Sequence, residues 1–157
     1  MAYEIERKFL VINDDWKSQV SNSAYYRQAY LAGNDRSSVR VRIADSQAWL
    51  NIKSATLGIQ RTEYEYEIPV SDAGEMIANL CQGAAIEKWR HFVPHAGHVW
   101  EIDVFEGANQ GLVVAEIELD DVAESFEKPP WIGAEVSDDP RYYNVCLVEH
   151  PYSDWEK

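Results

Sequence analysis

Polar and apolar residues alternate along much of the chain, a pattern typical of β-strands that bury one face and expose the other. Residues 4–10, "EIERKFL", place Glu4, Glu6 and Lys8 on one face of such a strand. Comparable stretches predict eight strands, over roughly residues 3–12, 24–32, 37–44, 47–55, 59–69, 85–94, 98–106 and 112–120.

Short, turn-rich connections such as "AGND", "ADSQ", "PHAG" and "EGANQG" follow several of these strands. Connections of this length join antiparallel neighbours, and closing such a sheet on itself removes its edges. The sequence therefore predicts a mainly β (α+β) fold. It is an eight-stranded antiparallel β-barrel, or tunnel, with a few flanking helices, in one domain over residues 1–157.

Helical patterns are few. One short helix is expected from Asn13, and a second begins with Ser71 as its cap and ends near Gly83. A third starts at Asp138, with Pro140 at a permitted early position. The intervening "EKPPWIGAEV" is expected to be irregular. Three helices would cover the outer apolar face only in part, which leaves room for a homodimer.

The 157-residue chain carries a net charge of −13, which argues against nucleic acid or an anionic membrane as a general partner. No apolar run approaches the roughly 18 residues of a membrane helix, and no signal-peptide core follows Met1, so we expect a cytoplasmic protein. Cys81 and Cys146 are far apart in the sequence and are expected to be free thiols.

Charges on the predicted strands are sorted by sign: Arg40 and Arg42 share one strand, whereas Glu116 and Glu118 share another. For any single strand, a solvated outer face is the ordinary explanation. Yet seven of the fourteen Lys and Arg residues lie in these rows, and like charges in a row repel. If the rows face inward, then water, divalent metal ions and a polyanion would balance them. Carboxylates bind Mg²⁺ or Mn²⁺, and Lys and Arg bind phosphate oxygens.

The motifs "EIERKFL", "VRVR", "LNIKS", "RTEYEYEIP", "EKWR", "WEIDVF" and "AEIEL" occur in this order over about residues 3–120. In this the chain resembles the CYTH superfamily, also called triphosphate tunnel metalloenzymes, and its short single-domain bacterial members in particular. The stretch "WIGAEVSDDPRYYN" is similar to their C-terminal part.

This resemblance implies a tunnel that binds a triphosphate together with Mg²⁺ or Mn²⁺. The carboxylates on the metal side would be Glu4, Glu6, Glu63, Glu65, Asp103, Glu116 and Glu118. The phosphate clamp would consist of Lys8, Arg40, Arg42, Lys53, Arg61, Lys88 and Arg90, and either Lys8 or Lys88 could assist catalytic proton transfer. Glu67 is a further candidate beside Glu63 and Glu65, whereas Glu101 is left out because it is nearer its strand end.

The implied activity is metal-dependent hydrolysis of inorganic tripolyphosphate to diphosphate and phosphate. A class IV adenylyl cyclase, which converts ATP to cyclic AMP, and a thiamine triphosphatase share the same motifs. Two alternatives of a different kind are a non-catalytic barrel that binds polyphosphate, and a small-ligand barrel with an apolar interior. The motifs alone do not separate these possibilities.

Overall fold

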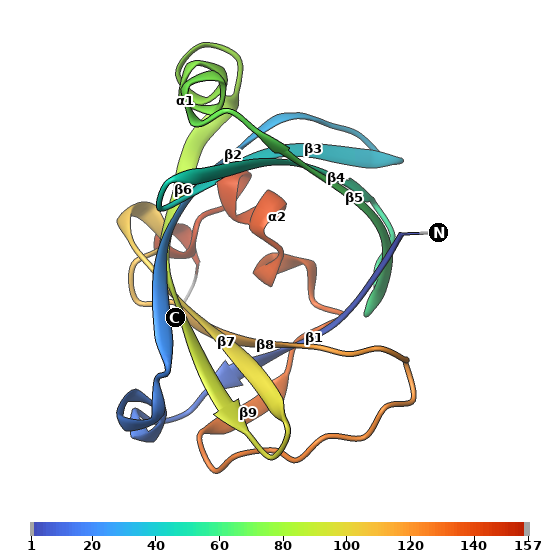
Figure 1. The fold of residues 1–157 in the computed structure, drawn as a ribbon, viewed down its shortest axis with the longest axis vertical. Coiled ribbons are helices and arrows are strands. Elements are labelled where there is room, and N and C mark those ends of the chain that lie inside the picture. Colours follow the sequence, from blue (N-terminus) through green and yellow to red (C-terminus); the bar gives the residue numbers. More distant parts are fainter. Residues whose placement is uncertain (1, 156–157) are drawn as a thin grey trace.

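The computed structural model describes residues 2–155 and shows a sheet closed into a barrel (Figure 1). The barrel strands are antiparallel and follow the order β5-β4-β3-β2-β6-β7-β8-β1, and β1 pairs with β5 to close the ring. Their bounds are β1 (Tyr3–Val11), β2 (Asn22–Gly33), β3 (Ser37–Ala44), β4 (Gln47–Ser54), β5 (Gln60–Ile68), β6 (Gln82–His95), β7 (His98–Phe105) and β8 (Val113–Glu118). The predicted eight-stranded barrel is confirmed.

The strand order departs from a sequential arrangement at two places. Strand β2 pairs with β6, and β1 lies between β8 and β5. In a closed ring of eight strands this order puts β1 directly across the barrel from β2. A ninth strand, β9 (Ile132–Glu135), pairs with β1 on the edge of the barrel. The prediction that "EKPPWIGAEV" is irregular is therefore wrong for residues 132–135, whereas residues 127–131 lie outside any helix or strand.

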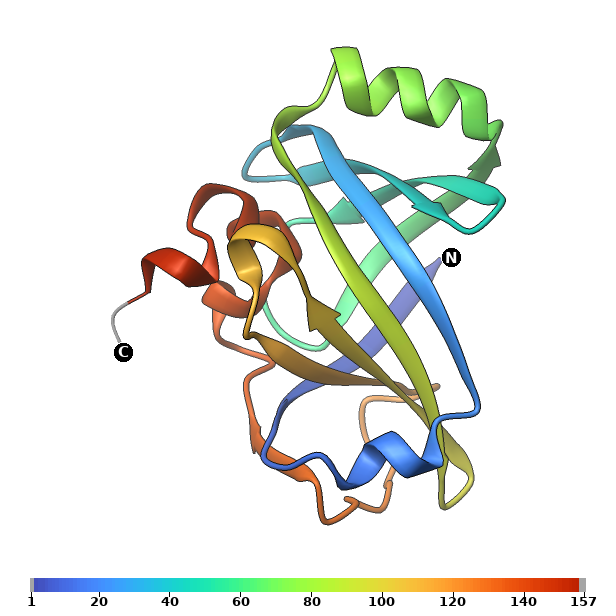
Figure 2. The same cartoon turned by 90° about the vertical axis from the view of Figure 1, so that its left-hand side faces the viewer.

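Helix α1 (Val70–Asn79) lies across the outside of the barrel over β2, β3 and β4 (Figure 2). Its N-cap is Pro69 rather than Ser71, and it ends at Asn79, well before Gly83, which lies in β6. The prediction of a Ser cap is therefore wrong, because Pro69 already has the extended backbone that a cap requires.

The other helices are short. The first predicted helix is the 3₁₀ turn η1 (Asp15–Gln19), and the third is divided into η3 (Pro140–Tyr142) and α2 (Asn144–Glu149). Two further 3₁₀ turns are η2 (Gly107–Asn109) and η4 (Tyr152–Asp154). No helix among the described residues is long and apolar enough to cross a membrane.

The outward faces of the strands carry most of the apolar core. Ala73 and Ile77 of α1 pack on Val41 and Ala48. On the opposite side a larger cluster joins barrel strands to η1, β9 and the chain before β9, through Phe9, Trp16, Trp100, Ile102, Ile117 and Trp131. Burying these outward faces leaves the charged faces of the same strands directed toward the inside of the barrel.

The inward face becomes apolar at one end of the barrel. Ile86, Phe105 and Val114 lie an even number of residues from the charged inward positions on their strands, and they cluster with Leu147 of α2. Because side chains of alternate residues share a face, this cluster is inside the barrel. Helix α2 therefore closes one end of the tunnel, as Figure 1 shows down the barrel axis.

Candidate functional site: a charged tunnel

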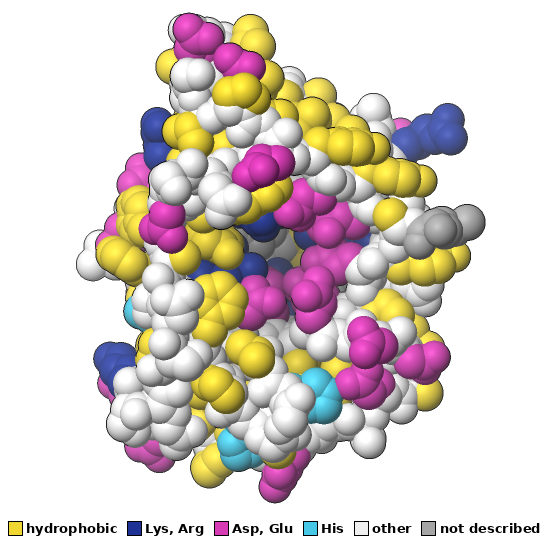
Figure 3. All heavy atoms as spheres, in the orientation of Figure 1, with side chains coloured by type: hydrophobic (Ala, Val, Ile, Leu, Met, Phe, Trp, Pro, Cys, Tyr) yellow, Lys and Arg dark blue, Asp and Glu magenta, His cyan; other side chains and the backbone are white. Residues whose placement is uncertain are grey.

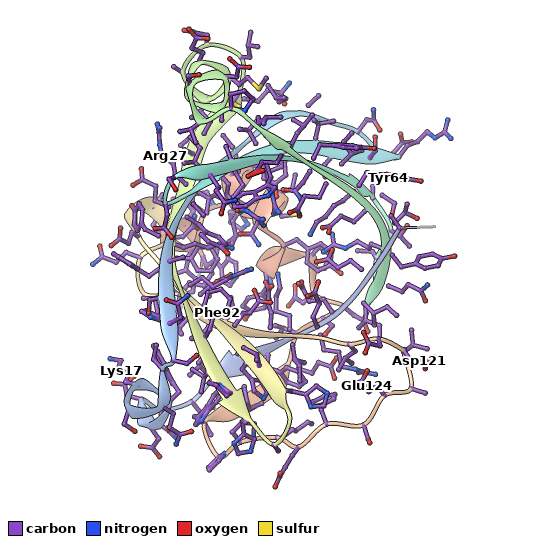
Figure 4. The ribbon with its side chains drawn as sticks, in the orientation of Figure 1. Lys17, Arg27, Tyr64, Phe92, Asp121 and Glu124 are labelled. Carbon is purple, nitrogen blue, oxygen red and sulfur yellow. The ribbon has the colours of Figure 1, made fainter. Side chains whose placement is uncertain are left out.

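The inside of the barrel is a cavity of about 350 Å³. All seven cations of the predicted clamp line it, as do six of the seven predicted metal-side carboxylates. These are Lys8, Arg40, Arg42, Lys53, Arg61, Lys88 and Arg90, together with Glu4, Glu6, Glu63, Glu65, Glu116 and Glu118. In Figure 3 acidic side chains border the opening of this cavity on its right and lower sides, and Lys and Arg side chains lie deeper. Alternate residues of the same strands point away from it, and Lys17, Arg27 and Tyr64 lie outside the ring of strands in Figure 4.

Strand order sorts the charges into two walls. Neighbouring strands β7, β8 and β1 supply an acidic wall of Glu4, Glu6, Glu101, Glu116 and Glu118. The basic wall lies on β3 and β6, either side of β2, and consists of Arg40, Arg42, Lys88 and Arg90. Because β1 lies across the barrel from β2, the two walls face each other. A phosphate chain on the basic wall would thus be directly opposite the carboxylates.

Ion pairs link oppositely charged side chains of the lining. Lys8 Nζ is 3.4 Å from Glu116 Oε1, and Lys53 Nζ is 2.9 Å from Glu4 Oε2 and 3.3 Å from Glu63 Oε2. The lining holds seven Lys and Arg residues and, with Glu101, seven carboxylates. A polyanion that enters would upset this balance unless cations accompany it.

Asp103 is not among the residues that line the cavity, because it is fully buried behind the basic wall. It accepts hydrogen bonds from Lys88 Nζ and Arg90 Nε, both at 2.8 Å. Burial alone would raise the Asp103 pKa, but Arg90 and then Lys88 outweigh burial and lower it. Asp103 therefore orients two cations of the basic wall, whereas Glu101, bonded to Arg90, faces the cavity.

The Lys and Arg side chains near the acidic wall offset only part of its negative charge. Burial raises the pKa of Glu6 well above its usual value, and the nearby Glu116 and Glu4 raise it further. The pKa of Glu118 is raised by burial and then by Glu4 and Glu63. Glu4 behaves oppositely: although burial opposes ionisation, the adjacent Lys53 lowers its pKa to about 2. This crowding favours an added cation at the wall.

The basic wall keeps unused hydrogen-bond donors. The buried Nε groups of Arg40 and Arg42 have no hydrogen-bond partner within residues 2–155. The Arg42 guanidinium lies over the rings of Tyr26 and Trp49, 5.1 and 4.9 Å from their centroids, which restricts its orientation. Oriented guanidinium donors of this kind match the oxygens of a phosphate chain.

The C-terminal segment fixes two lysines at the closed end. Lys8 Nζ donates to the Tyr142 carbonyl at 3.1 Å, and Lys88 Nζ donates to Asn144 Oδ1 at 3.1 Å. The Tyr143 ring lies 5.6 Å from Lys8 Nζ and 5.2 Å from the Arg61 guanidinium carbon. Burial lowers the Lys88 pKa to about 8, although Asp103 partly opposes this.

Several lining residues were missed by sequence reasoning, namely Tyr26, Gln28, Tyr30, Asn51, Glu101, Tyr143 and Asn144. On β2 the alternation of Tyr26, Gln28 and Tyr30 was a usable signal, but these residues carry no charge. Tyr143 and Asn144 come from a segment without strand periodicity, so only the folded chain places them at the tunnel.

A second cavity of about 600 Å³ adjoins the tunnel and shares Tyr30, Arg61 and Tyr143 with it. Small and apolar side chains contribute much of its lining, among them Leu57 and Val148. It could therefore hold an uncharged organic group beside the phosphate-binding wall.

The carboxylates do not form a ready-made metal site. Within residues 2–155 no group of three or more His, Cys, Asp or Glu side chains is arranged to hold a metal ion. The acids are instead engaged with Lys and Arg, as for Glu4 with Lys53. Their donor chemistry nevertheless suits hard divalent cations, which bind carboxylate oxygen.

Known proteins are similar to this chain over nearly its whole length. The CYTH domain family matches residues 2–143. An inorganic triphosphatase of Acetivibrio thermocellus is 46% identical over 157 residues, covering 100% of both chains, and one of Nitrosomonas europaea is 36% identical over 92% of this chain and 96% of its own. A crystal structure of an inorganic triphosphatase superposes with a TM-score of 0.67 at 34% identity, covering 94% of this chain and 95% of that one.

Proposed function

The chain belongs to the CYTH domain family, and on that premise we propose that it is an inorganic triphosphatase that hydrolyses tripolyphosphate to diphosphate and phosphate. The observation that carries this proposal is the tunnel itself, in which seven cations and seven carboxylates line one cavity. An inward charged surface of this kind excludes a barrel for apolar ligands, because the apolar faces of the strands are directed outward.

The basic wall would bind the phosphate chain. Arg40 and Arg42 line the cavity from β3, and Arg61 lines it from β5. Lys88 and Arg90 are held in place by the buried Asp103, so they are positioned before the substrate arrives. Prior positioning of charge is the main means by which phosphoryl transfer is accelerated.

The acidic wall would hold Mg²⁺ or Mn²⁺. Glu4, Glu6, Glu116 and Glu118 would bind it. The pKa of Glu6 is raised by burial and then by repulsion from Glu116 and Glu4, and a divalent cation would relieve that repulsion. Glu63 lies beside Glu4 through their shared partner Lys53, whereas Glu65 is paired with Arg42. Bound divalent metal lowers the pKa of a bound water and offsets charge on phosphate oxygens.

The reaction is a displacement at the terminal phosphorus by water. Lys8 on β1 is 3.4 Å from Glu116 and lines the tunnel, so it can contact both phosphate and the acidic wall. Lys8 and Lys88 donate hydrogen bonds to phosphate oxygens. These bonds stabilise the negative charge that develops on the leaving diphosphate. No side chain need bond covalently to phosphorus.

A second candidate substrate class is an organic triphosphate. The apolar cavity beside Tyr30, Arg61 and Tyr143 offers space for a base or a thiazole ring. The cyclase and thiamine triphosphatase alternatives would both use this space. The full-length relatives named above are inorganic triphosphatases, and this favours tripolyphosphate as the substrate.

Phosphorus NMR of tripolyphosphate incubated with the protein tests the proposal. With Mg²⁺ the terminal and central phosphate signals should be replaced by those of diphosphate and phosphate in equal amounts, and EDTA should stop the change. An unchanged spectrum together with a metal-linked rise in melting temperature would instead indicate a polyphosphate-binding barrel without activity.

The cytoplasm is the proposed site of the reaction. Cys81 and Cys146 are both free thiols, which agrees with a reducing compartment.

A further inference from the structure

Asn51 is a buried amide that lines the tunnel from β4. Only 1% of its surface is exposed, and its strand partners are Arg40 on β3 and Glu65 on β5. Residues directly opposite each other in a sheet point to the same face, so these three side chains form a row across neighbouring strands. An uncharged side chain therefore lies between a cation and an anion of the lining.

Both ends of the Asn51 amide are hydrogen-bonded, and the two partners fix its orientation. Arg40 Nη2 donates to Asn51 Oδ1 at 3.3 Å, and Asn51 Nδ2 donates to Glu65 Oε2 at 2.7 Å. A guanidinium can only donate and an ionised carboxylate can only accept, so rotating the amide would place like groups against each other at both ends. The other oxygen of Glu65 is 3.5 Å from Arg42 Nη2. Asn51 is thus held in one orientation, with its oxygen toward Arg40.

Arg40 differs from the rest of the basic wall in how it is held. Each of the other three cations of this wall pairs with a carboxylate, at distances from 2.8 to 3.5 Å. Arg40 is also buried, but it forms no ion pair with any of the described residues. Burial would lower its pKa, whereas nearby Tyr30 and Glu4 outweigh burial and raise it, so the guanidinium stays charged.

A neutral amide orients this guanidinium without offsetting its charge. A carboxylate at position 51 would also bond to Arg40, but it would weaken the attraction for phosphate and would repel Glu65. An apolar side chain there would leave the buried guanidinium without this acceptor. Asn is a short side chain that accepts from Arg40 and donates to Glu65 at the same time.

We propose that Asn51 is a positioning residue that presents the charged Arg40 to the phosphate chain; this rests on the triphosphatase function proposed above. Asn51 acts through Arg40 and touches no reacting atom. Glu65 anchors the amide from the other side, so it supports the basic wall. Arg40 binds phosphate in the substrate and in the transition state alike, and loss of its orientation should therefore raise KM more than it lowers kcat.

Two substitutions of Asn51 test this role. Asn51→Leu keeps the approximate size of the side chain and removes both hydrogen bonds. In that variant KM for tripolyphosphate with Mg²⁺ should rise at least about fivefold, while kcat changes by less than about threefold. Asn51→Asp keeps an acceptor for Arg40 but offsets its charge, so KM should rise at least as much as in Asn51→Leu.

A double-mutant cycle with Arg40→Gln tests whether Asn51 acts through Arg40. Arg40→Gln lacks the guanidinium that Asn51 orients. Adding Asn51→Leu to it should therefore lower kcat/KM by less than about a further twofold. A further loss as large as that of Asn51→Leu alone would mean that Asn51 acts on another group.

The matched control is Asn109→Leu. Asn109 is also a buried amide, and its Oδ1 accepts from the Tyr152 N–H at 2.9 Å, but it does not line the tunnel. Its substitution should lower the melting temperature and leave KM unchanged. A merely structural role for Asn51 would give this same result in Asn51→Leu. Melting curves of all variants show which of them are folded.

A wild-type KM in a folded Asn51→Leu would overturn the proposal, because Arg40 would then need no amide to hold it. If Asn51→Leu does not fold, a wild-type KM in Asn51→Asp would overturn it, because a neutral partner for Arg40 would be unnecessary. Failure of the wild-type protein to hydrolyse tripolyphosphate would refute the proposed function instead, so the two failures are distinguishable.

Discussion

At the scale of single residues, the tunnel works through charges that are buried in opposed pairs. Alternation in the sequence was enough to select the lining cations, because on a strand the inward face follows from the phase of its apolar residues. It did not distinguish Asp103 from Glu101, which are two residues apart and in the same phase. Asp103 is covered because Lys88 and Arg90 both bond to it, and only the packed barrel brings those three together.

Among the carboxylates, Glu116 is the one whose loss should lower kcat most. It pairs with both Lys8 and Arg90 and lies on the proposed metal side. Replacing it by Gln removes charge with little change in shape. We expect Glu116→Gln to lower kcat for tripolyphosphate by about a hundredfold or more in the presence of Mg²⁺. The matched control is Glu135→Gln, which breaks a pair with Arg7 outside the tunnel and should leave kcat unchanged. Equal kcat in the two variants would contradict the role given to Glu116.

Because the pKa of Lys88 is lowered, we predict that substrate binding depends on pH. Burial lowers its pKa to about 8, so in the free enzyme the ammonium loses its proton as the pH rises past about 8. A neutral amine attracts phosphate less, and kcat/KM for tripolyphosphate should therefore fall across this range. In Lys88→Arg the guanidinium stays charged, and the fall should move to higher pH. The same fall in both proteins would show that another group titrates.

At the scale of elements, the strands and their closure into a barrel were predictable, but the strand order that closes the barrel was not. Eight alternating stretches gave strand bounds close to those observed, since each strand has one apolar and one charged face. The pairing of β1 with β5 and β8 brings together residues far apart in the sequence, and alternation carries no signal for it. The closed end was missed for a related reason: Leu147 reaches the inside of the barrel from a helix of only six residues.

Gly83 is expected to control how α2 meets the barrel. It has a φ of +69°, and a Cβ added there would lie 2.6 Å from Val148 Cγ1. Gly83→Ala should therefore lower the free energy of unfolding by more than about 1 kcal/mol, measured by denaturant melting. Gly74 in α1 is the matched control, since a Cβ there meets nothing within 4 Å. Gly74→Ala should raise the free energy of unfolding by roughly 0.5–1 kcal/mol. A neutral Gly83→Ala would mean that α2 docks loosely.

At the scale of the whole molecule, a net charge of −13 is compatible with an anionic substrate because half of the cations are gathered inside the barrel. Composition argued against nucleic acid as a general partner, but only the pattern of residues along the strands indicated the local reversal of charge. The homodimer stays a prediction. Tyr64 and Tyr66 on the outer face of β5 are 44% and 56% exposed, and such a face is where a second copy would be sought.

The central claim is that this tunnel hydrolyses inorganic tripolyphosphate. The most direct measurement is kcat/KM for tripolyphosphate and for ATP on the same preparation, with Mg²⁺, Mn²⁺ or EDTA, assayed for phosphate and for cyclic AMP. We predict metal-dependent phosphate release from tripolyphosphate, with kcat/KM exceeding that for ATP by about a hundredfold or more. Equal or faster turnover of ATP, formation of cyclic AMP, or no release from tripolyphosphate would contradict the claim.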